Sequence, residues 1–238
     1  MPMHVLVIQF SGSTCDRDLV NAMRNVMGWN VDFVWYQEAQ NIIENYDAIF
    51  LPGGFAYGDY LRAGIIAAFT PVMKKVKEIA KEGIPVLGIC NGFQILVESE
   101  LLPGALIGNE TLRFSCKWTN LRVETTRSSA TNIAKKGDVW KIPIAHGEGR
   151  YYLDKVGLKQ LNENDQVVWR YVNDEGETTK EANPNGSIEN IAGICNLEGN
   201  IVGLMPHPER AAENIISPFN TDHGKSYFHS IENFFRRK

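Results

Sequence analysis

Short apolar runs alternate with amphipathic segments over roughly the first hundred residues. Four segments are predicted as strands: residues 4–10, 31–35, 47–51 and 84–89. The first is a continuous apolar run, as expected of a strand buried on both faces. Helical spacing of apolar residues is found in residues 16–27, in 59–82 with a break near Pro71, and in 90–98. This alternation predicts parallel βαβ units, and hence an α/β fold with a doubly wound, mostly parallel central sheet.

The second half of the chain has a different pattern, with shorter strand signals separated by turns. They are residues 117–125, 141–145, 167–172, 191–196 and 201–205. We expect them to form an antiparallel extension of the same sheet. Residues 176–189 are polar and predict a loop, and residues 224–238 predict a closing helix. Because no linker interrupts the chain, we expect a single domain over residues 1–238.

The loops that follow parallel strands gather at one edge of such a sheet, because βαβ crossovers are nearly always right-handed. Ligands bind at that edge in open α/β folds. Three of the predicted loops leave strand ends there, namely residues 11–13, 52–54 and 90–92. A site for chemistry is therefore expected where these loops meet.

Composition narrows the class of protein. The net charge of −4 and pI near 5.8 argue against a nucleic-acid binder, which usually carries a clustered basic surface. No signal peptide is recognisable, and no apolar run approaches the ~18 residues of a membrane span. The four cysteines form no C-x-x-C pair, so neither zinc nor a redox motif is indicated. We expect a cytoplasmic protein with free thiols.

The most informative motif is G-x-C-x-G, which lies between the fourth apolar run and a predicted helix. Gly88 and Gly92 are expected because bulkier side chains would clash in so tight a turn. The helix N-terminus favours a thiolate at Cys90, and the Asn91 N–H can help to hold an oxyanion. Most free cysteines are buried and inert, but the strand before this motif and the helix after it favour a nucleophile.

A cysteine nucleophile needs a base, and the base needs a group that orients it. His207 follows the last strand signal, and Pro208 biases it toward extended backbone. Glu209, two residues on, would then lie on the same side as His207. His146, in a glycine-rich loop, is the second candidate base; it could instead contact substrate or a partner, or have no chemical role.

Residues 52–54 read Pro-Gly-Gly, directly after the third apolar run. A glycine pair lets main-chain N–H groups point into a site without obstruction by side chains. Gly53 and Gly54 are therefore candidate substrate-binding residues that, with Asn91, would supply an oxyanion hole. Alone, this motif is equally compatible with an ordinary tight turn.

Pro-Gly-Gly, G-x-C-x-G-x-Q and H-P-E, in this order, resemble the class I (triad) glutamine amidotransferases, whose architecture is flavodoxin-like. Within that class, four stretches are similar to the glutaminase subunits of phosphoribosylformylglycinamidine synthases: residues 52–64, 88–94, 146–152 and 206–210. The resemblance covers nearly the whole chain.

The resemblance implies a role for each motif residue. Cys90 would attack the amide of glutamine, His207 would carry its proton, and Glu209 would orient His207. Gly54 and Asn91 would bind the oxyanion, and Gln94 would help to hold the substrate. Ammonia would pass to a separate large synthetase subunit, joined through a small bridging subunit. ATP and magnesium would bind that synthetase, and this chain would need no cofactor or metal.

Two other classes stay open at this point. A cysteine hydrolase or deglycase on a similar sheet would also place a cysteine at an elbow, although it would not require H-P-E together with Pro-Gly-Gly. A regulatory or scaffold subunit without catalytic activity is the non-enzymatic alternative. Release of glutamate from glutamine distinguishes all three.

Overall fold

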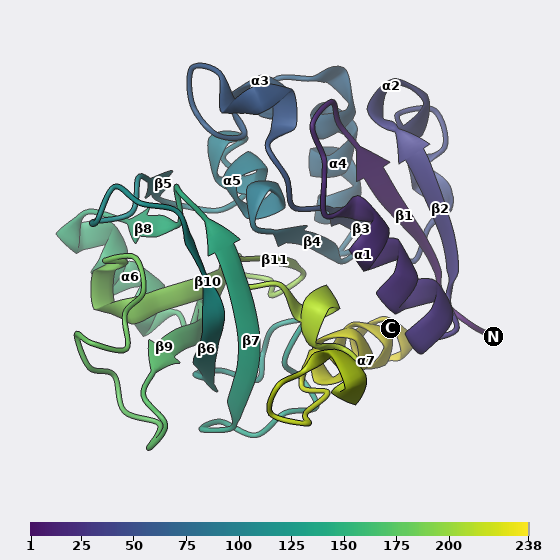
Figure 1. The fold of residues 1–238 in the computed structure, drawn as a ribbon. Coiled ribbons are helices and arrows are strands. Elements are labelled where there is room, and N and C mark those ends of the chain that lie inside the picture. The colour runs from purple at the N-terminus through teal and green to yellow at the C-terminus, as the bar shows by residue number, and fades with distance from the viewer. Residues whose placement is uncertain (238) are drawn as a thin grey trace.

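The computed structural model describes residues 1–237, and its central feature is a nine-stranded sheet (Figure 1). The order of strands across the sheet is β2-β1-β3-β4-β11-β10-β9-β6-β7. Their bounds, in that order, are Asn30–Trp35, His4–Gln9, Ala48–Leu51, Val86–Ile89, Ile201–Leu204, Ile191–Cys195, Val167–Val172, Ser115–Val123 and Val139–His146.

One half of the sheet is parallel. Strand β1 pairs with β2 and β3, β3 pairs with β4, and β4 pairs with β11, all in parallel. The strands β1, β3, β4 and β11 are almost wholly buried, as their continuous apolar runs predict. The carboxyl ends of β4 and β11 therefore lie side by side at one edge of the sheet.

Helices cover both faces of this parallel half, which confirms the doubly wound prediction (Figure 1). On one face, α5 (Asn91–Glu98) packs so closely that a Cβ at Gly203 in β11 would lie 2.0 Å from the Phe93 ring. On the other face, α7 (Gly224–Arg236) packs Tyr227 against Trp169 and Phe228 against Trp29. The helices α1 (Asp16–Asn21), α3 (Ile65–Ala68) and α4 (Pro71–Lys81) complete the two layers.

The other half of the sheet is the predicted antiparallel extension, with one correction. Residues 201–205 were expected in it, but β11 pairs in parallel with β4 and so belongs to the parallel half, because apolar spacing does not encode the direction of a strand. Strand β10 is antiparallel to both β11 and β9, and β6 is antiparallel to both β9 and β7. The sheet is continuous, so the two halves share one core of buried apolar residues. Residues 176–187 contain no helix or strand, in line with the predicted loop.

The helical prediction for residues 59–82 is only partly right. Helices occupy Ile65–Ala68 and Pro71–Lys81, but Asp59, Leu61 and Gly64 have φ values of 52°, 70° and 80°. Such left-handed backbone cannot continue a right-handed helix, although the apolar spacing hides this. The predicted closing helix is described as far as Arg236, and Lys238 lies outside the described residues.

Several elements are present that the sequence pattern did not predict. They are the short helices α2 (Tyr36–Ala39) and α6 (Lys155–Glu163), and a separate two-stranded pair, β5 (Ala105–Ile107) with β8 (Arg150–Tyr152). The Asp154 carboxylate caps α6 by accepting from Gly157 N at 2.7 Å. The β5–β8 pair matters for function because it anchors the loop that contains His146 and Glu148.

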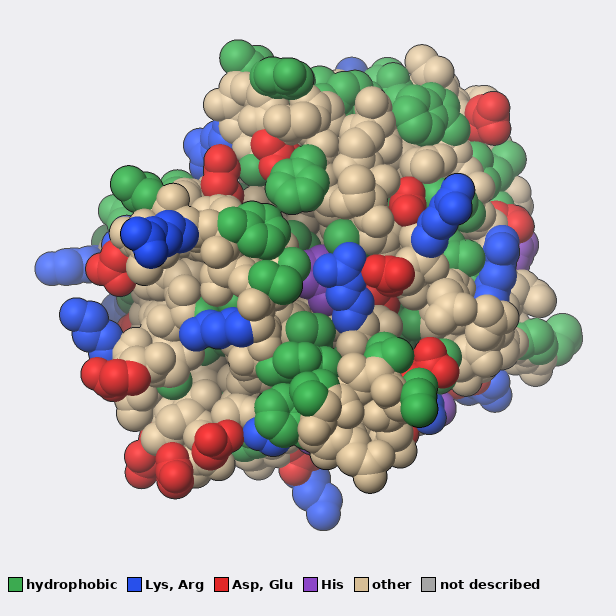
Figure 2. All heavy atoms as spheres, in the orientation of Figure 1, with side chains coloured by type: hydrophobic (Ala, Val, Ile, Leu, Met, Phe, Trp, Pro, Cys, Tyr) green, Lys and Arg blue, Asp and Glu red, His purple; other side chains and the backbone are tan. Residues whose placement is uncertain are grey.

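Among residues 1–237, no helix is both long and apolar enough to cross a membrane. On the face shown in Figure 2, acidic and basic side chains are interspersed, and apolar side chains gather over the middle of the face. Phe55 and Phe114 are both about half exposed, and their rings lie 6.4 Å apart.

Candidate active site

Cys90 lies in the tight turn between β4 and α5. Its backbone is strained, with φ 51° and ψ −106°. A Cβ at Gly88 would lie 2.5 Å from the Gly92 carbonyl oxygen, and a Cβ at Gly92 would lie 2.0 Å from the Leu51 oxygen. Both glycines are therefore required for the turn to close, as the sequence predicts.

His207 reaches the same edge because β11 runs parallel to β4 and ends beside it. The His207 N–H donates to the Pro143 oxygen at 2.8 Å, which fixes this segment against β7. Its Nδ1 lies 2.6 Å from Oε1 of Glu209, and both side chains are almost completely buried. The predicted pairing of His207 with Glu209 is present, although Glu209 lies in a short 3₁₀ turn (Pro208–Ala211) and not in extended chain.

Electrostatics favour a charged imidazole at this position. Burial opposes protonation, but the Glu209 carboxylate and the adjacent Cys90 sulfur raise the pKa of His207 well above its ordinary value. Nε2 of His207 is buried and has no hydrogen-bond partner within residues 1–237. This nitrogen is therefore available to exchange a proton with the neighbouring thiol.

The Pro-Gly-Gly loop packs directly on this imidazole. A Cβ at Gly53 would lie 2.9 Å from Cε1 of His207 and 3.2 Å from Sγ of Cys15. Gly53 thus makes room for the base. Gly54 has φ +148°, and a Cβ there would lie 2.6 Å from the Gly12 oxygen. Cys15 is a second thiol behind the base, and burial raises its pKa, so it stays protonated.

Asn91 and Gln94 tie the site together through their side chains. The Asn91 amide accepts from Ala56 N at 2.9 Å and donates to Gln94 Oε1 at 2.7 Å. Gln94 Nε2 then donates to the Glu148 backbone oxygen at 2.7 Å. The Asn91 N–H, the first of helix α5, has no acceptor within its helix. The structure thus brings together all seven residues expected at the site.

A small pocket of about 130 Å³ opens in front of Cys90. Its lining comes from four separated parts of the chain: Gly54, Phe55, Asp59, Cys90, Gln94, Phe114, Ala145, His146, Gly147 and Glu148. The Cys90 sulfur lies 3.8 Å from the Ala145 oxygen on the pocket wall. The nucleophile therefore faces a cavity that is bounded by polar and charged groups.

His146 is a buried, neutral pocket residue. Burial lowers its pKa to about 4, and the nearby His207 acts in the same direction. Its Nδ1 faces Asn109 Oδ1 at 3.1 Å, and no carboxylate orients it. These surroundings favour His207 over His146 as the base.

Three residues that the sequence pattern did not single out belong to this site. Asp59 and Glu148 line the pocket, and Asn109 holds His146. Nothing in the spacing of Asp59 or Asn109 points to the site, because tertiary contacts alone bring them there.

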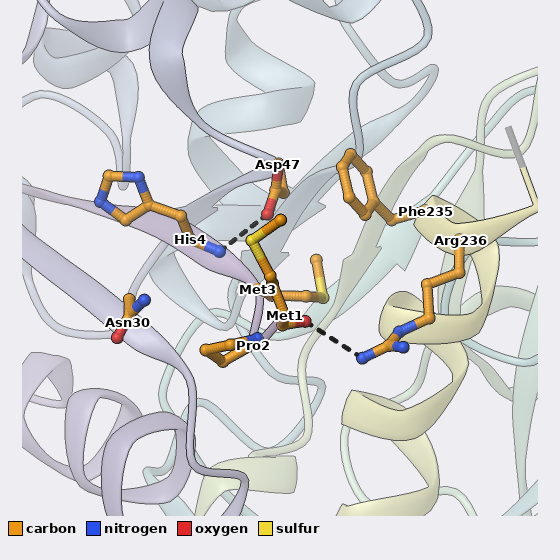
Figure 3. Close-up of a pocket in the computed structure, with 8 residues that line it drawn as sticks. All are labelled: Met1, Pro2, Met3, His4, Asn30, Asp47, Phe235 and Arg236. Carbon is orange, nitrogen blue, oxygen red and sulfur yellow. Dashed lines mark hydrogen bonds between the residues drawn. The ribbon is translucent and has the colours of Figure 1, made fainter.

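A larger pocket, of about 650 Å³, is at the opposite edge of the sheet, where β1 and β2 begin (Figure 3). It is lined by the N-terminal residues, Asp47, Phe235 and Arg236, and it holds no cysteine. Arg236 donates there to the Met1 oxygen at 3.3 Å. Within the described chain, no group of three or more His, Cys, Asp or Glu side chains is placed to bind a metal.

The fold is that of a glutamine amidotransferase, and Cys90 and the His207–Glu209 pair lie at the ends of its neighbouring strands β4 and β11. The family pattern described as a CobB/CobQ-like glutamine amidotransferase domain matches residues 2–237, and this chain belongs to that family.

Individual proteins that resemble this chain indicate a narrower group than the family pattern does. The chain is 52% identical over 232 residues to phosphoribosylformylglycinamidine synthase subunit PurQ of Methanosarcina mazei, covering 98% of each chain. It is 53% identical to the same subunit of Methanosarcina acetivorans, again with 98% of each chain covered. Among solved structures, a chain of PurLQS from Thermotoga maritima matches with a TM-score of 0.84 and 42% identity, over 98% of this chain and 99% of that one.

Proposed function

We propose that this chain is the glutaminase subunit of a phosphoribosylformylglycinamidine synthase, and that it hydrolyses glutamine to glutamate and ammonia for purine biosynthesis. The chain's similarity to subunit PurQ over almost its full length supports the proposal. The observation that carries the chemistry is the buried His207–Glu209 pair, 2.6 Å apart, beside a cysteine at a strained elbow. Residues 1–238 would act as one amidotransferase domain.

The first half of the reaction forms a thioester. His207 holds the proton of the Cys90 thiol on Nε2, and the Cys90 thiolate attacks the side-chain carbonyl carbon of glutamine. Negative charge develops on the amide oxygen, and the N–H groups of Gly54 and Asn91 would stabilise it. The tetrahedral intermediate then collapses, the C–N bond breaks, and His207 returns the proton to the departing ammonia.

The second half hydrolyses this γ-glutamyl thioester. Water gives a proton to His207 and attacks the thioester carbon, and the C–S bond breaks to release glutamate and the Cys90 thiol. Glu209 keeps the ring orientation and stabilises the imidazolium in both halves. Gln94, held between Asn91 and Glu148, shapes the substrate pocket.

The ammonia would be used in a second reaction, on a partner subunit. We infer that a large synthetase subunit receives it, binds ATP and magnesium, and converts formylglycinamide ribonucleotide to the amidine. The PurLQS assembly from Thermotoga maritima supports both this subunit and a small bridging subunit. All four cysteines are unpaired, which suits a reducing cytoplasm.

The test is glutamine-dependent release of glutamate by the chain reconstituted with its synthetase subunits. Cys90→Ser should abolish release, whereas Cys116→Ser, at an exposed cysteine, should leave it unchanged. Retained release in Cys90→Ser would refute the proposal. Turnover of esters or glyoxals without turnover of glutamine would favour a different cysteine hydrolase.

A further inference from the structure

Two carboxylates, Asp59 and Glu148, line the Cys90 pocket, and the reaction steps above leave their charges without a role. No lysine or arginine is among the residues that line this pocket. Arg62, on the same segment as Asp59, pairs with Glu98 at 2.7 Å. The pocket is therefore lined by two acidic side chains and by no lysine or arginine that could neutralise them.

Helix α5 bonds the carboxylate of Asp59 and the backbone of Glu148. Asn91 Nδ2 donates to Asp59 Oδ1 at 3.2 Å, and Gln94 Nε2 fixes the Glu148 backbone at 2.7 Å. Burial first, and then the Glu148 charge, raises the pKa of Asp59 to about 6. This like-charge arrangement calls for a cation from outside the chain.

His146 contributes an independent observation to the same pocket. The Asn109 amide nitrogen donates to the Arg113 and His146 backbone oxygens at 2.8 and 2.9 Å, so its oxygen must face His146 Nδ1. Nδ1 consequently carries the proton, and Nε2 is left as an acceptor. This Nε2 is buried and has no partner within residues 1–237. His146 is among the residues that line the pocket, and an N–H donor from a ligand would satisfy this buried acceptor.

We propose that Asp59 and Glu148 receive the α-ammonium group of the substrate glutamine and thereby select the free amino acid. The inference rests on the function proposed above and adds the residues that set substrate specificity. An ammonium group presents three N–H donors and one positive charge. The two carboxylates match that charge, and His146 Nε2 adds a neutral acceptor for a substrate N–H.

A measurable selectivity follows. A pocket built to pair with a substrate N–H rejects an analogue that lacks the group, because its own acceptors are then left unpaired. Glutaramate is glutamine without its α-amino group and retains the reacting amide. The wild-type complex should therefore use glutaramate far less well than glutamine, on the order of 100-fold or more in kcat/KM.

The experiment compares Asp59→Asn and Glu148→Gln in the reconstituted complex, with ammonia release as the readout for both substrates. Each variant should lower the ratio of kcat/KM for glutamine to that for glutaramate by about 10-fold, mainly through a higher KM for glutamine. Asparagine tolerates the φ of 52° at position 59. Asp165→Asn is the matched control, since Asp165 is exposed and has φ 51°; it should leave the ratio unchanged.

Each outcome decides the matter. A lowered ratio in both variants supports the inference. A ratio that stays at the wild-type value, including an equal loss for both substrates, overturns it while glutamine hydrolysis by the wild type stands. A further outcome would also overturn the inference. If the ratio of kcat/KM values is unchanged but less ammonia reaches the acceptor substrate for each glutamine hydrolysed, the two carboxylates act on the released ammonium and not on the substrate. Absence of glutamine hydrolysis by the wild-type complex would instead refute the proposed function.

Discussion

Glu209→Gln is the substitution that separates orientation of the base from construction of the pocket. The side chain keeps its size but loses the charge that lies 2.6 Å from His207 Nδ1. At an effective dielectric constant of about 20, unit charges ~4 Å apart interact by about 4 kcal/mol. If that stabilisation of the imidazolium is lost in the transition state, kcat should fall by about 10³-fold. KM should change little, because Glu209 does not line the pocket.

The assay is glutamate release by the reconstituted complex over a range of glutamine concentrations. Glu163→Gln is the control, because Glu163 forms only an exposed ion pair with Lys159. The free energy of unfolding gives a second readout. Because the pKa of His207 is raised on folding, its protonation stabilises the fold, and this contribution is fully present below about pH 6.5. That stabilisation is lost as pH rises through the raised pKa, and it should be absent from Glu209→Gln. An unchanged kcat would show that another group orients His207.

Three further substitutions test other parts of the site. Gly53→Ala should lower kcat by about 10-fold or more with little loss of stability. The added Cβ would lie only 2.9 Å from Cε1 of His207 and would push the ring out of position. Steady-state kinetics measures the first effect and thermal unfolding the second. Gly92→Ala should instead destabilise the protein by about 3 kcal/mol or more, measured by urea unfolding, because its Cβ would lie 2.0 Å from the Leu51 oxygen. His146 binds a proton more weakly when folded, at a pKa of about 4, than when unfolded, so the wild type should lose about 2 kcal/mol of stability between pH 7 and pH 5 that His146→Gln does not lose. An equal pH dependence in the two proteins would contradict the buried, neutral state of His146.

The sequence pattern predicts the parts of the fold that local rules determine. The apolar segments locate β1, β3, β4 and β11, and the parallel βαβ pattern places Cys90 at the edge where ligands bind. Gly88 and Gly92 are required by steric limits alone, and the structure shows both close contacts. The motifs therefore indicate the members of the site, but the parallel pairing of β11 with β4, which brings His207 beside Cys90, was not predicted because apolar spacing does not encode strand direction.

What the pattern could not predict depends on tertiary contacts. Leu61 and Asp59 adopt left-handed backbone, whereas their spacing favours a helix. Asp59 is held by Asn91, 32 residues away, and His146 by Asn109, 37 residues away. No local signal encodes such pairings, so the carboxylates of the pocket become visible only in the folded chain.

Whether Cys90 carries a γ-glutamyl group during turnover is the most direct test of the mechanism. The complex would be mixed with glutamine, quenched in acid within the first turnovers, digested, and examined by mass spectrometry. We expect the adduct on the peptide that contains Cys90 and on no peptide with Cys15, Cys116 or Cys195. Two results would contradict the account while glutamate is still released. One is an adduct on another cysteine. The other is the absence of an adduct on Cys90 under conditions that slow hydrolysis of the thioester.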